Sequence, residues 1–410
     1  MADYDLYVGI DWATQTHQVC VVDARGDRRE QWQVAHSGAG LAELAASLRA
    51  LAPAPARIAV GLEIPRGAVV DTLLEEGCDV FAVNPNQLDR FRDRHTVAGA
   101  KDDRRDAFVL ADALRTDGWA FRRLTREDPR VIQLREVSRL HDELRQERTR
   151  LTNRLREQLV RFYPHALALC AAADEPWLWI LLERAPTPAH AHRLTVRTLR
   201  AVLASHRIRR FTAEELHAAL GAPALRVAPG TTEAASEHVA LLLPRLRLVD
   251  EQQKQCDRRL ESLLAALATG EGDGAQREQR DVTILRSCPG LGRVVAATLL
   301  AEATKPLAER DYQTLRGQAG TAPVTRQSGK GRSVSMRHSC NPRLRAAMFY
   351  WAQTAIRADA RCRSHYQRLR QRHGYARALR TIADRLLAML IAMLRSGTLY
   401  EPARRLAIAA

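Results

Sequence analysis

The sequence predicts an α/β domain at the N-terminal end, followed by a long and mostly α-helical remainder. Three observations carry this prediction. Strand-like runs crowd into residues 4–35, strand-like and helical runs then alternate to about residue 118, and helical periodicity dominates after Val131. A β-meander followed by alternating helices and strands is typical of a mixed sheet flanked by helices. We therefore divide the chain into residues 1–125, 126–270 and 281–410, with a polar, glycine-rich linker at 268–280.

The N-terminal elements follow from apolar runs and the turns between them. Residues 4–35 contain three such runs, two of them joined by "DARGD", a sequence typical of a hairpin turn. Helices end where glycine or a proline-rich stretch follows the last apolar residue. The later predicted elements are a helix at 39–52, a strand at 57–64, a helix at 67–77, a strand at 79–85 and an amphipathic helix at 100–118.

Two long segments of the middle region carry apolar residues at helical spacing. The first runs from Val131 to Phe162, and the second follows "APGTTE" and ends near Leu267. They could pair as an antiparallel coiled coil or belong to an ordinary helical bundle. Pro244 predicts either a kink or a later start in the second helix. Either arrangement would serve as a spacer or an oligomerisation arm.

The composition favours a polyanionic partner. The net charge is +16, which indicates nucleic acid, whereas aromatic residues make up only 5% and argue against a stacking platform for single strands. Seven scattered cysteines without a C-x-x-C pair indicate reduced thiols rather than zinc or disulfides. The N-terminal residues do not resemble a signal peptide, and the longest apolar runs are too short to span a bilayer. We expect a cytoplasmic protein without a membrane partner.

Four acidic residues are predicted to meet at one edge of the sheet. Asp11 ends the first strand and Glu63 lies near the end of the fourth, while Asp103 and Asp106 are three residues apart on one helix face. Such a group is stable only if it is partly protonated or neutralised by cations. Mg²⁺ prefers carboxylate oxygens, and two such ions can serve chemistry at a phosphodiester. The alternatives are a turn-capping role for Asp11 and a solvated helix face for the last two acids.

The segment "SCPGLGRVVAATLLAE", residues 287–302, resembles a helix-hairpin-helix element. Its Pro-Gly-x-Gly turn feeds a helix, so backbone N–H groups near Gly290 and Gly292 could hold a DNA phosphate without reading sequence. The alternative is a simple packing element between two helices.

A cationic segment at residues 320–352 contains a candidate nucleophile. Ser328 lies in "RQSGKGR", which predicts a flexible, positive loop in which a serine could attack a phosphodiester. The alternative is a phosphate-contacting loop whose serine only donates a hydrogen bond. The predicted nucleic-acid contacts near this serine and near the acids are Arg326, Lys330, Arg332, Arg337, Arg343, Arg345, Lys101 and Arg104.

Taken in order, "GIDWA", "GLEIPRG", "AKDDRRDA", "LRSCPGLGRVVAATLLAE" and "GTAPVTRQSGKGRSVSMRHSCNPRLRAAM" resemble the DEDD transposases of bacterial insertion sequences. This is the "insertion sequence one-ten" family, also called bridge-RNA-guided recombinases, and the resemblance covers most of the chain. It implies a RuvC-like, RNase H-like domain whose Asp11, Glu63, Asp103 and Asp106 bind Mg²⁺. It also implies a connecting coiled coil and a C-terminal transposase domain with Ser328 as the nucleophile.

The same resemblance implies the partners: donor DNA, target DNA, a noncoding bridge RNA and further copies of the chain, as a dimer or tetramer. It places the protein in the bacterial cytoplasm at the nucleoid. Two other functions are kept as alternatives. One is a metal-dependent junction nuclease that cuts without rejoining, and the other is a non-catalytic nucleic-acid-binding protein with the same fold.

Two departures from the family pattern leave residue choices open. Asp102 stands where Thr or Ser is common and lies one helical turn from Asp106, so either Asp102 or Asp103 could be the ligand. "SCN" replaces the common "RGN", which puts Cys340 where glycine is usual. Ser333 and Ser335 lie close enough to Ser328 to be confused with it.

Overall fold

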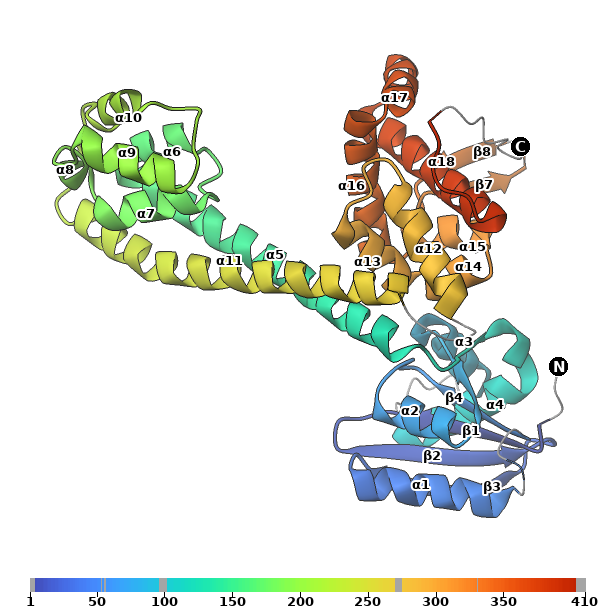
Figure 1. Cartoon of the computed structure of the whole chain (residues 1–410). Coiled ribbons are helices and arrows are strands. Elements are labelled where there is room, and N and C mark those ends of the chain that lie inside the picture. Colours follow the sequence, from blue (N-terminus) through green and yellow to red (C-terminus); the bar gives the residue numbers. More distant parts are fainter. Residues whose placement is uncertain are drawn as a thin grey trace. The chain divides into compact units, whose positions relative to one another are not determined.

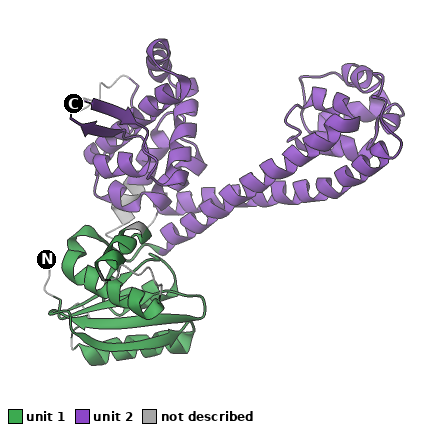
Figure 2. Ribbon diagram, turned by 180° about the vertical axis from the view of Figure 1, so that it is seen from behind, with its two compact units in different colours: residues 1–128 green, residues 129–410 purple. Residues whose placement is uncertain are grey.

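The computed structural model describes residues 4–52, 54, 57–95, 102–269, 275–329 and 331–402. The chain forms two compact units, residues 1–128 and residues 129–410 (Figure 2), and each is considered by itself. None of the helices in these described ranges is long and apolar enough to cross a membrane. All seven cysteines lie within the described ranges and are free thiols.

Unit 1 is built on a six-stranded mixed sheet, which confirms the predicted α/β domain. Its strand order is β3-β2-β1-β4-β5-β6. The first three strands form an antiparallel meander, β4 and β5 continue the sheet parallel to β1, and β6 pairs antiparallel with β5. The bounds are β1 (Leu6–Asp11), β2 (Thr16–Asp23), β3 (Arg28–Ala35), β4 (Ile58–Leu62), β5 (Asp79–Ala82) and β6 (Arg122–Arg123).

Helices cover both faces of this sheet, so its central strands read as continuous apolar runs. Val8 and Ile10 of β1 share a core with α1 and α2, whereas the opposite face of the sheet packs against α3 and α4. The helices are α1 (Gly38–Leu51), α2 (Ala68–Glu75), α3 (Pro85–His95) and α4 (Asp103–Asp117). Helix α3 was not predicted from the sequence.

Two long helices of unit 2, α5 (Pro129–Phe162) and α11 (Thr231–Thr269), lie side by side and form a helical arm (Figure 1). Pro244 lies inside α11, which has already begun at Thr231, so the predicted later start is wrong. Five short helices follow α5 at one end of the arm around buried Trp177 and Trp179. They are α6 (Pro164–Leu169), α7 (Pro176–Arg184), α8 (Pro188–Ala191), α9 (Val196–Ser205) and α10 (Ala213–Leu220).

The rest of unit 2 is mostly helical, as predicted, around a core that contains Trp351 and Leu387. Its helices are α12 (Ala275–Ser287), α13 (Arg293–Glu302), α14 (Thr304–Ala308), α15 (Tyr312–Gln318), α16 (Pro342–Ala358), α17 (Ala360–Arg372) and α18 (Tyr375–Ser396). The strands β7 (Val324–Ser328) and β8 (Gly331–Ser335) form a separate hairpin. The predicted bounds of the linker, residues 268–280, are wrong, because α11 extends to Thr269 and α12 begins at Ala275.

Candidate active site

Two glycines allow α4 to lie directly on the sheet. Gly9 of β1 and Gly61 of β4 are partners across the parallel pair. A Cβ atom at Gly9 would lie 1.9 Å from the carbonyl oxygen of Ala107, and one at Gly61 would lie 3.3 Å from that of Leu110. Arg115, in the last turn of α4, lies against the β2–β3 turn at Gly26. This turn is next to the beginning of β1, so the first turn of α4 points toward the edge where β1 ends.

Asp11 and Glu63 leave the sheet at this edge. Asp11 is the last residue of β1, and Glu63 directly follows β4. Ile10 and Leu62, the residues before them, are partners in the parallel register. Neighbouring parallel strands end on the same side of a sheet, so both half-buried acids belong to one edge, as predicted.

Asp106 is buried on α4, with 1% of its surface exposed, and Arg92 of α3 binds it through two hydrogen bonds. Arg92 Nε donates to Oδ1 at 2.7 Å and Nη2 donates to Oδ2 at 2.8 Å. Arg92 Nη2 also lies 3.8 Å from Glu63 Oε1. A bidentate, charge-assisted pair of this kind offsets the cost of burying a carboxylate. The guanidinium therefore connects two of the predicted acids.

Asp102 and Asp103 occupy different positions at the start of α4. Asp102 is the N-cap, and its carboxylate accepts a hydrogen bond from the Arg104 backbone N–H at 3.2 Å. Asp103 is exposed in the first turn, three residues before Asp106. Lys101 lies outside the described residues. Asp102 thus has a structural task that Asp103 lacks.

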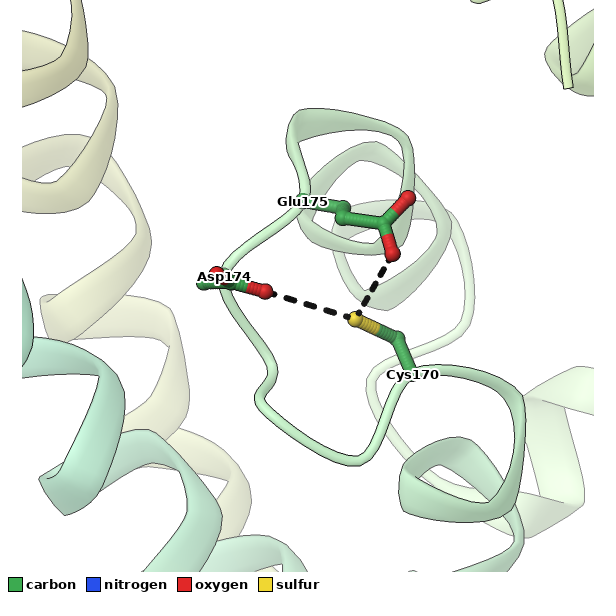
Figure 3. A group of neighbouring side chains, drawn as sticks. All are labelled: Cys170, Asp174 and Glu175. Carbon is green, nitrogen blue, oxygen red and sulfur yellow. Dashed lines mark hydrogen bonds between the residues drawn. The ribbon is translucent and has the colours of Figure 1, made fainter. Parts of the chain in front are cut away.

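The described residues contain one group of three Cys, Asp or Glu side chains whose ligand atoms all lie within 4.8 Å of one another. This group does not include the four predicted acids. It comprises Cys170, Asp174 and Glu175 in unit 2 (Figure 3). Burial raises the pKa of the Cys170 thiol, which donates to Glu175 Oε1 at 3.4 Å. Glu175 also pairs with Arg210 at 2.7 Å and accepts from Trp177 Nε1. A protonated thiol and a carboxylate already bound to guanidinium fit a structural cluster better than a metal centre.

Ser328 lies at the end of a strand rather than in the predicted flexible loop. It is the last residue of β7 and pairs with Gly331 of β8, so only two residues separate the strands. Gly329 occupies the left-handed region at φ +55°, which suits such a tight hairpin turn. Ser328 is exposed, while Lys330 lies outside the described residues. The hairpin therefore presents Ser328 at its tip.

The predicted cations of this segment have different surroundings. Arg326 and Arg332 are exposed on the hairpin, and so are Ser333 and Ser335. Arg337 and Arg345 are half-buried. Of these cations, the two on the hairpin are the best placed to meet a phosphate.

Arg343 instead belongs to an internal network that joins α5, α13 and α16. It donates to Ser138 Oγ at 2.8 Å and lies 3.1 Å from Glu302. Glu302 also pairs with Arg139 at 3.1 Å and accepts from Asn341 Nδ2 at 3.0 Å. Burial alone would raise the pKa of Glu302, but these hydrogen bonds and charges lower it overall. Arg343 thus stabilises the base of the arm.

The turn between α12 and α13 has the predicted helix–hairpin–helix order. Gly290 has φ +69°, and a Cβ there would lie 2.5 Å from the backbone of Thr354 and Ala355, so this glycine serves close packing on α16. Gly292 is the exposed N-cap of α13. The two glycines therefore differ: Gly290 packs closely against α16, and Gly292 leaves a helix start open.

Comparison with known protein families matches both units. Residues 8–164 match a family described as "Transposase", a DEDD type named for IS110. Residues 282–367 match the family described as "Transposase IS116/IS110/IS902 family". The first match contains all four predicted acids, and the second contains Ser328 and both glycines of the α12–α13 turn.

Relatives with curated names agree with these matches. The chain is 33% identical to the "Mini-circle putative transposase for IS117" of Streptomyces coelicolor, over 98% of this chain and 97% of that protein. It is 50% identical to the "Putative transposase y4uE" of Sinorhizobium fredii, but that match spans only 58% of the relative. It is 30% identical to the "Insertion element IS110 uncharacterized 43.6 kDa protein" of Streptomyces coelicolor, over 78% of that protein. The chain belongs to the insertion-sequence transposases of the IS116/IS110/IS902 family.

Proposed function

We propose that this transposase cuts and rejoins DNA strands by Mg²⁺-dependent transesterification with Ser328 as the nucleophile. The observation that carries the proposal is the pairing of buried Asp106 with the Arg92 guanidinium beside Glu63. A fold that buries a carboxylate at a sheet edge and supplies it with a cation is built to hold positive charge there. The DEDD family match and the strand order support an RNase H-like fold for unit 1.

The chemistry of the donor set fits Mg²⁺. Carboxylate oxygens are its preferred ligands, and Asp11, Glu63, Asp103 and Asp106 would hold it once Arg92 releases Asp106. We favour Asp103 over Asp102 because the Asp102 carboxylate caps α4. Bound there, the metal would offset the negative charge that develops on the attacked phosphate.

The serine chemistry follows from the hairpin. In cleavage, Ser328 Oγ forms a bond to phosphorus while the bond from phosphorus to a deoxyribose oxygen breaks, and that oxygen leaves as a hydroxyl. In joining, the hydroxyl of another strand attacks the same phosphorus and releases the serine, so no ATP is consumed. Arg326 and Arg332 can offset charge on the phosphate. The hairpin sequence contains no carboxylate or imidazole, so the proton of Ser328 must pass to a group outside residues 324–335.

We further propose that the arm joins copies of the chain through a coiled coil. Leu241 and Leu248 lie seven residues apart on α11, and both are exposed. Apolar side chains at heptad spacing are the pattern by which one helix packs against another. A dimer or tetramer assembled this way could complete one active site from two chains.

The remaining partners are donor DNA, target DNA and a noncoding bridge RNA that selects them in the bacterial cytoplasm at the nucleoid. The net charge of +16 supports binding to polyanions. RNA that copurifies with the protein should contain one discrete species encoded beside its gene. Random cellular fragments alone would contradict guidance by RNA.

The activity is tested with purified protein, its copurified RNA, Mg²⁺ and labelled donor and target DNA. We expect joined donor–target product from the wild type and none from Asp11→Asn, Glu63→Gln or Asp106→Asn, with DNA binding retained. Asp27→Asn, an exposed acid on the β2–β3 turn, is the matched control. Cleaved but unjoined DNA would favour the junction nuclease. DNA binding without cleavage by the wild type would favour a non-catalytic protein.

The same assay identifies the acid at the start of α4. We expect Asp103→Asn to abolish product formation, and Asp102→Asn to leave most of it. The reverse result would assign the ligand to Asp102.

A further inference from the structure

Three aromatic rings gather on the surface of unit 2. Phe349 and Tyr350 lie on α16 and Tyr375 begins α18, with 38%, 46% and 47% of their surfaces exposed. The ring centroids of Phe349 and Tyr350 are 5.9 Å apart, and those of Phe349 and Tyr375 are 6.2 Å apart. The core side of α16 is formed by other residues, among them Met348 and Trp351. Single exposed apolar residues are ordinary, but grouped ones mark an interaction surface.

Arginines border the rings on both sides. The guanidinium carbon of Arg145, on α5, lies 5.8 Å from the centroid of Tyr350, and that of Arg370, on α17, lies 6.0 Å from the centroid of Tyr375. Gln353 holds Tyr375 by donating from Nε2 to its hydroxyl at 2.6 Å. Cations beside partly exposed rings suit a ligand that is both flat and anionic. We call these three rings and two arginines the ring–arginine surface.

An arginine-rich cavity of the arm continues this surface. Arg145 also lines a cavity of about 320 Å³, together with Arg148, Arg156 and the polar side chains of Thr149 and Asn153. Asp174 is also part of its lining, Asp142 pairs with Arg145 at 2.8 Å, and Asp250 lies 3.3 Å from Arg148. The Nε atom of Arg148 is buried and has no hydrogen-bond partner. Arg145 belongs both to this cavity and to the ring–arginine surface. A phosphate in the cavity would meet Arg156 directly and would share Arg145 and Arg148 with their carboxylate partners.

We infer that the ring–arginine surface binds unpaired nucleotides of a single-stranded nucleic acid. Bases stack on the ring faces that remain open, and phosphates contact the bordering arginines and the arm cavity. A cationic path with aromatic side chains is how proteins bind single strands, because every base offers a face for stacking. A duplex keeps its base faces covered, so this surface selects unpaired segments. The inference goes beyond the proposed strand exchange and uses neither the acids nor Ser328.

The test is fluorescence anisotropy of the full chain with a short single strand, its abasic counterpart of equal length and the corresponding duplex, each as DNA and as RNA. We expect Phe349→Ala with Tyr375→Ala to raise Kd for the base-containing single strand about tenfold or more. Affinity for the abasic and duplex probes stays unchanged. Comparison of the DNA and RNA probes tells which nucleic acid the surface prefers.

A second pair of variants separates stacking from charge. Arg145→Gln with Arg370→Gln weakens the binding of both base-containing and abasic single strands and reduces the salt slope by about one per arginine. Removing the rings leaves the salt slope as it was. Phe349→Tyr with Tyr375→Phe keeps both rings and should retain wild-type affinity, and unchanged binding of the abasic and duplex probes by the alanine variant excludes misfolding as the cause of its loss. Trp119→Ala, which removes an exposed ring of unit 1, is the matched control.

Three outcomes would overturn the inference. The ring variant could bind every probe like the wild type, or lose abasic and base-containing strands equally. It could also change the oligomeric state measured by light scattering while oligonucleotide affinity stays constant, which would make the surface a protein–protein contact. Asp11→Asn should bind these probes normally although it makes no joined product, so failure here is distinguishable from failure of the proposed strand exchange.

Discussion

Gly9→Ala tests whether the glycine contact between β1 and α4 positions the acids. The added Cβ would lie 1.9 Å from the Ala107 carbonyl oxygen and 2.6 Å from the Ala111 backbone nitrogen. These are backbone atoms of one helix, so no side-chain rotation relieves the clash. To restore an ordinary contact of 3.4 Å, α4 must retreat by about 1.5 Å at this point. Asp106, the residue before Ala107, has to move with it.

The loss of folding free energy in Gly9→Ala follows from overpacking. Forcing one extra methyl into a well-packed interior costs about 1–3 kcal/mol. The gain from a less flexible unfolded chain offsets about 0.4–1 kcal/mol of this. Because the contact involves rigid backbone on both sides, we place Gly9→Ala near the upper end, at a net loss of about 2 kcal/mol. The partner position gives the matched control, since Gly61→Ala meets its nearest atom at 3.3 Å and should destabilise unit 1 much less than Gly9→Ala.

The assay is amide hydrogen exchange of the α4 segment, followed by mass spectrometry. A loss of about 2 kcal/mol makes the exchange of its protected amides about 30-fold faster, because 1.4 kcal/mol corresponds to a factor of ten. Gly9→Ala should also weaken Mn²⁺ binding, measured by electron paramagnetic resonance, because Asp106 is displaced. Equal α4 protection in Gly9→Ala, Gly61→Ala and the wild type would refute the reasoning.

Two further predictions concern buried charges. Glu302→Gln should cost about 3 kcal/mol at pH 7, because it leaves two partly buried guanidinium groups without their carboxylate. The pKa of Glu302 is lowered in the fold, so this contribution should be complete above the ordinary glutamate pKa of about 4.3 and should fade as pH falls from there through the lowered folded-state pKa; denaturation curves of variant and wild type should converge below that folded-state pKa. Glu309→Gln, at an exposed residue, is the control. A stability difference between Glu302→Gln and the wild type that persists at acid pH would contradict the assignment of this contribution to the Glu302 carboxylate. Arg92→Gln should lower the melting temperature without divalent ions, because the buried Asp106 carboxylate loses the two hydrogen bonds and the positive charge of Arg92, and Mg²⁺ should restore part of the loss. Arg90→Gln, on the exposed side of the same helix, should change neither value, and an Arg92 variant insensitive to Mg²⁺ would contradict a metal site at Asp106.

Much of the fold could be predicted because burial leaves a periodic pattern. The strands of unit 1 and the two arm helices each bury a face or a stripe, and their apolar runs mark them in the sequence. The β7–β8 hairpin shows why other elements could not be predicted from the sequence. Most of its residues are exposed, so no alternation separates this hairpin from the loop predicted around Ser328. Helix α3 is similarly polar, with "PNQLDRFRDRH" offering few apolar positions.

Some residues of the candidate site could likewise be predicted from the sequence, and others could not. Asp11 and Glu63 could be placed because each lies at the end of a buried strand, and the ends of neighbouring parallel strands meet at a sheet edge. The role of Arg92 could not be predicted, because its partner Asp106 is 14 residues away and only the tertiary fold brings α3 beside α4. Arg343 was predicted as a nucleic-acid contact from a run of charge, yet the fold gives it internal partners.

The aromatic surface shows a limit of composition. An aromatic content of 5% argues against a stacking platform, but a count over the whole chain cannot show whether a few rings meet in the fold. Phe349 and Tyr350 are neighbours on α16, and Tyr375 joins them only because α18 packs beside α16.

Trapping of a covalent protein–DNA intermediate tests the central claim most directly. With a nicked donor substrate and Mg²⁺, the wild type should form an adduct that survives denaturant, and peptide mapping should place the phosphodiester on Ser328. Ser328→Ala and Asp106→Asn should bind the same DNA and form no adduct. An adduct on Ser333 or Ser335 would move the nucleophile along the hairpin. Cleavage by the wild type without any adduct would contradict serine-based strand exchange and favour hydrolysis by water.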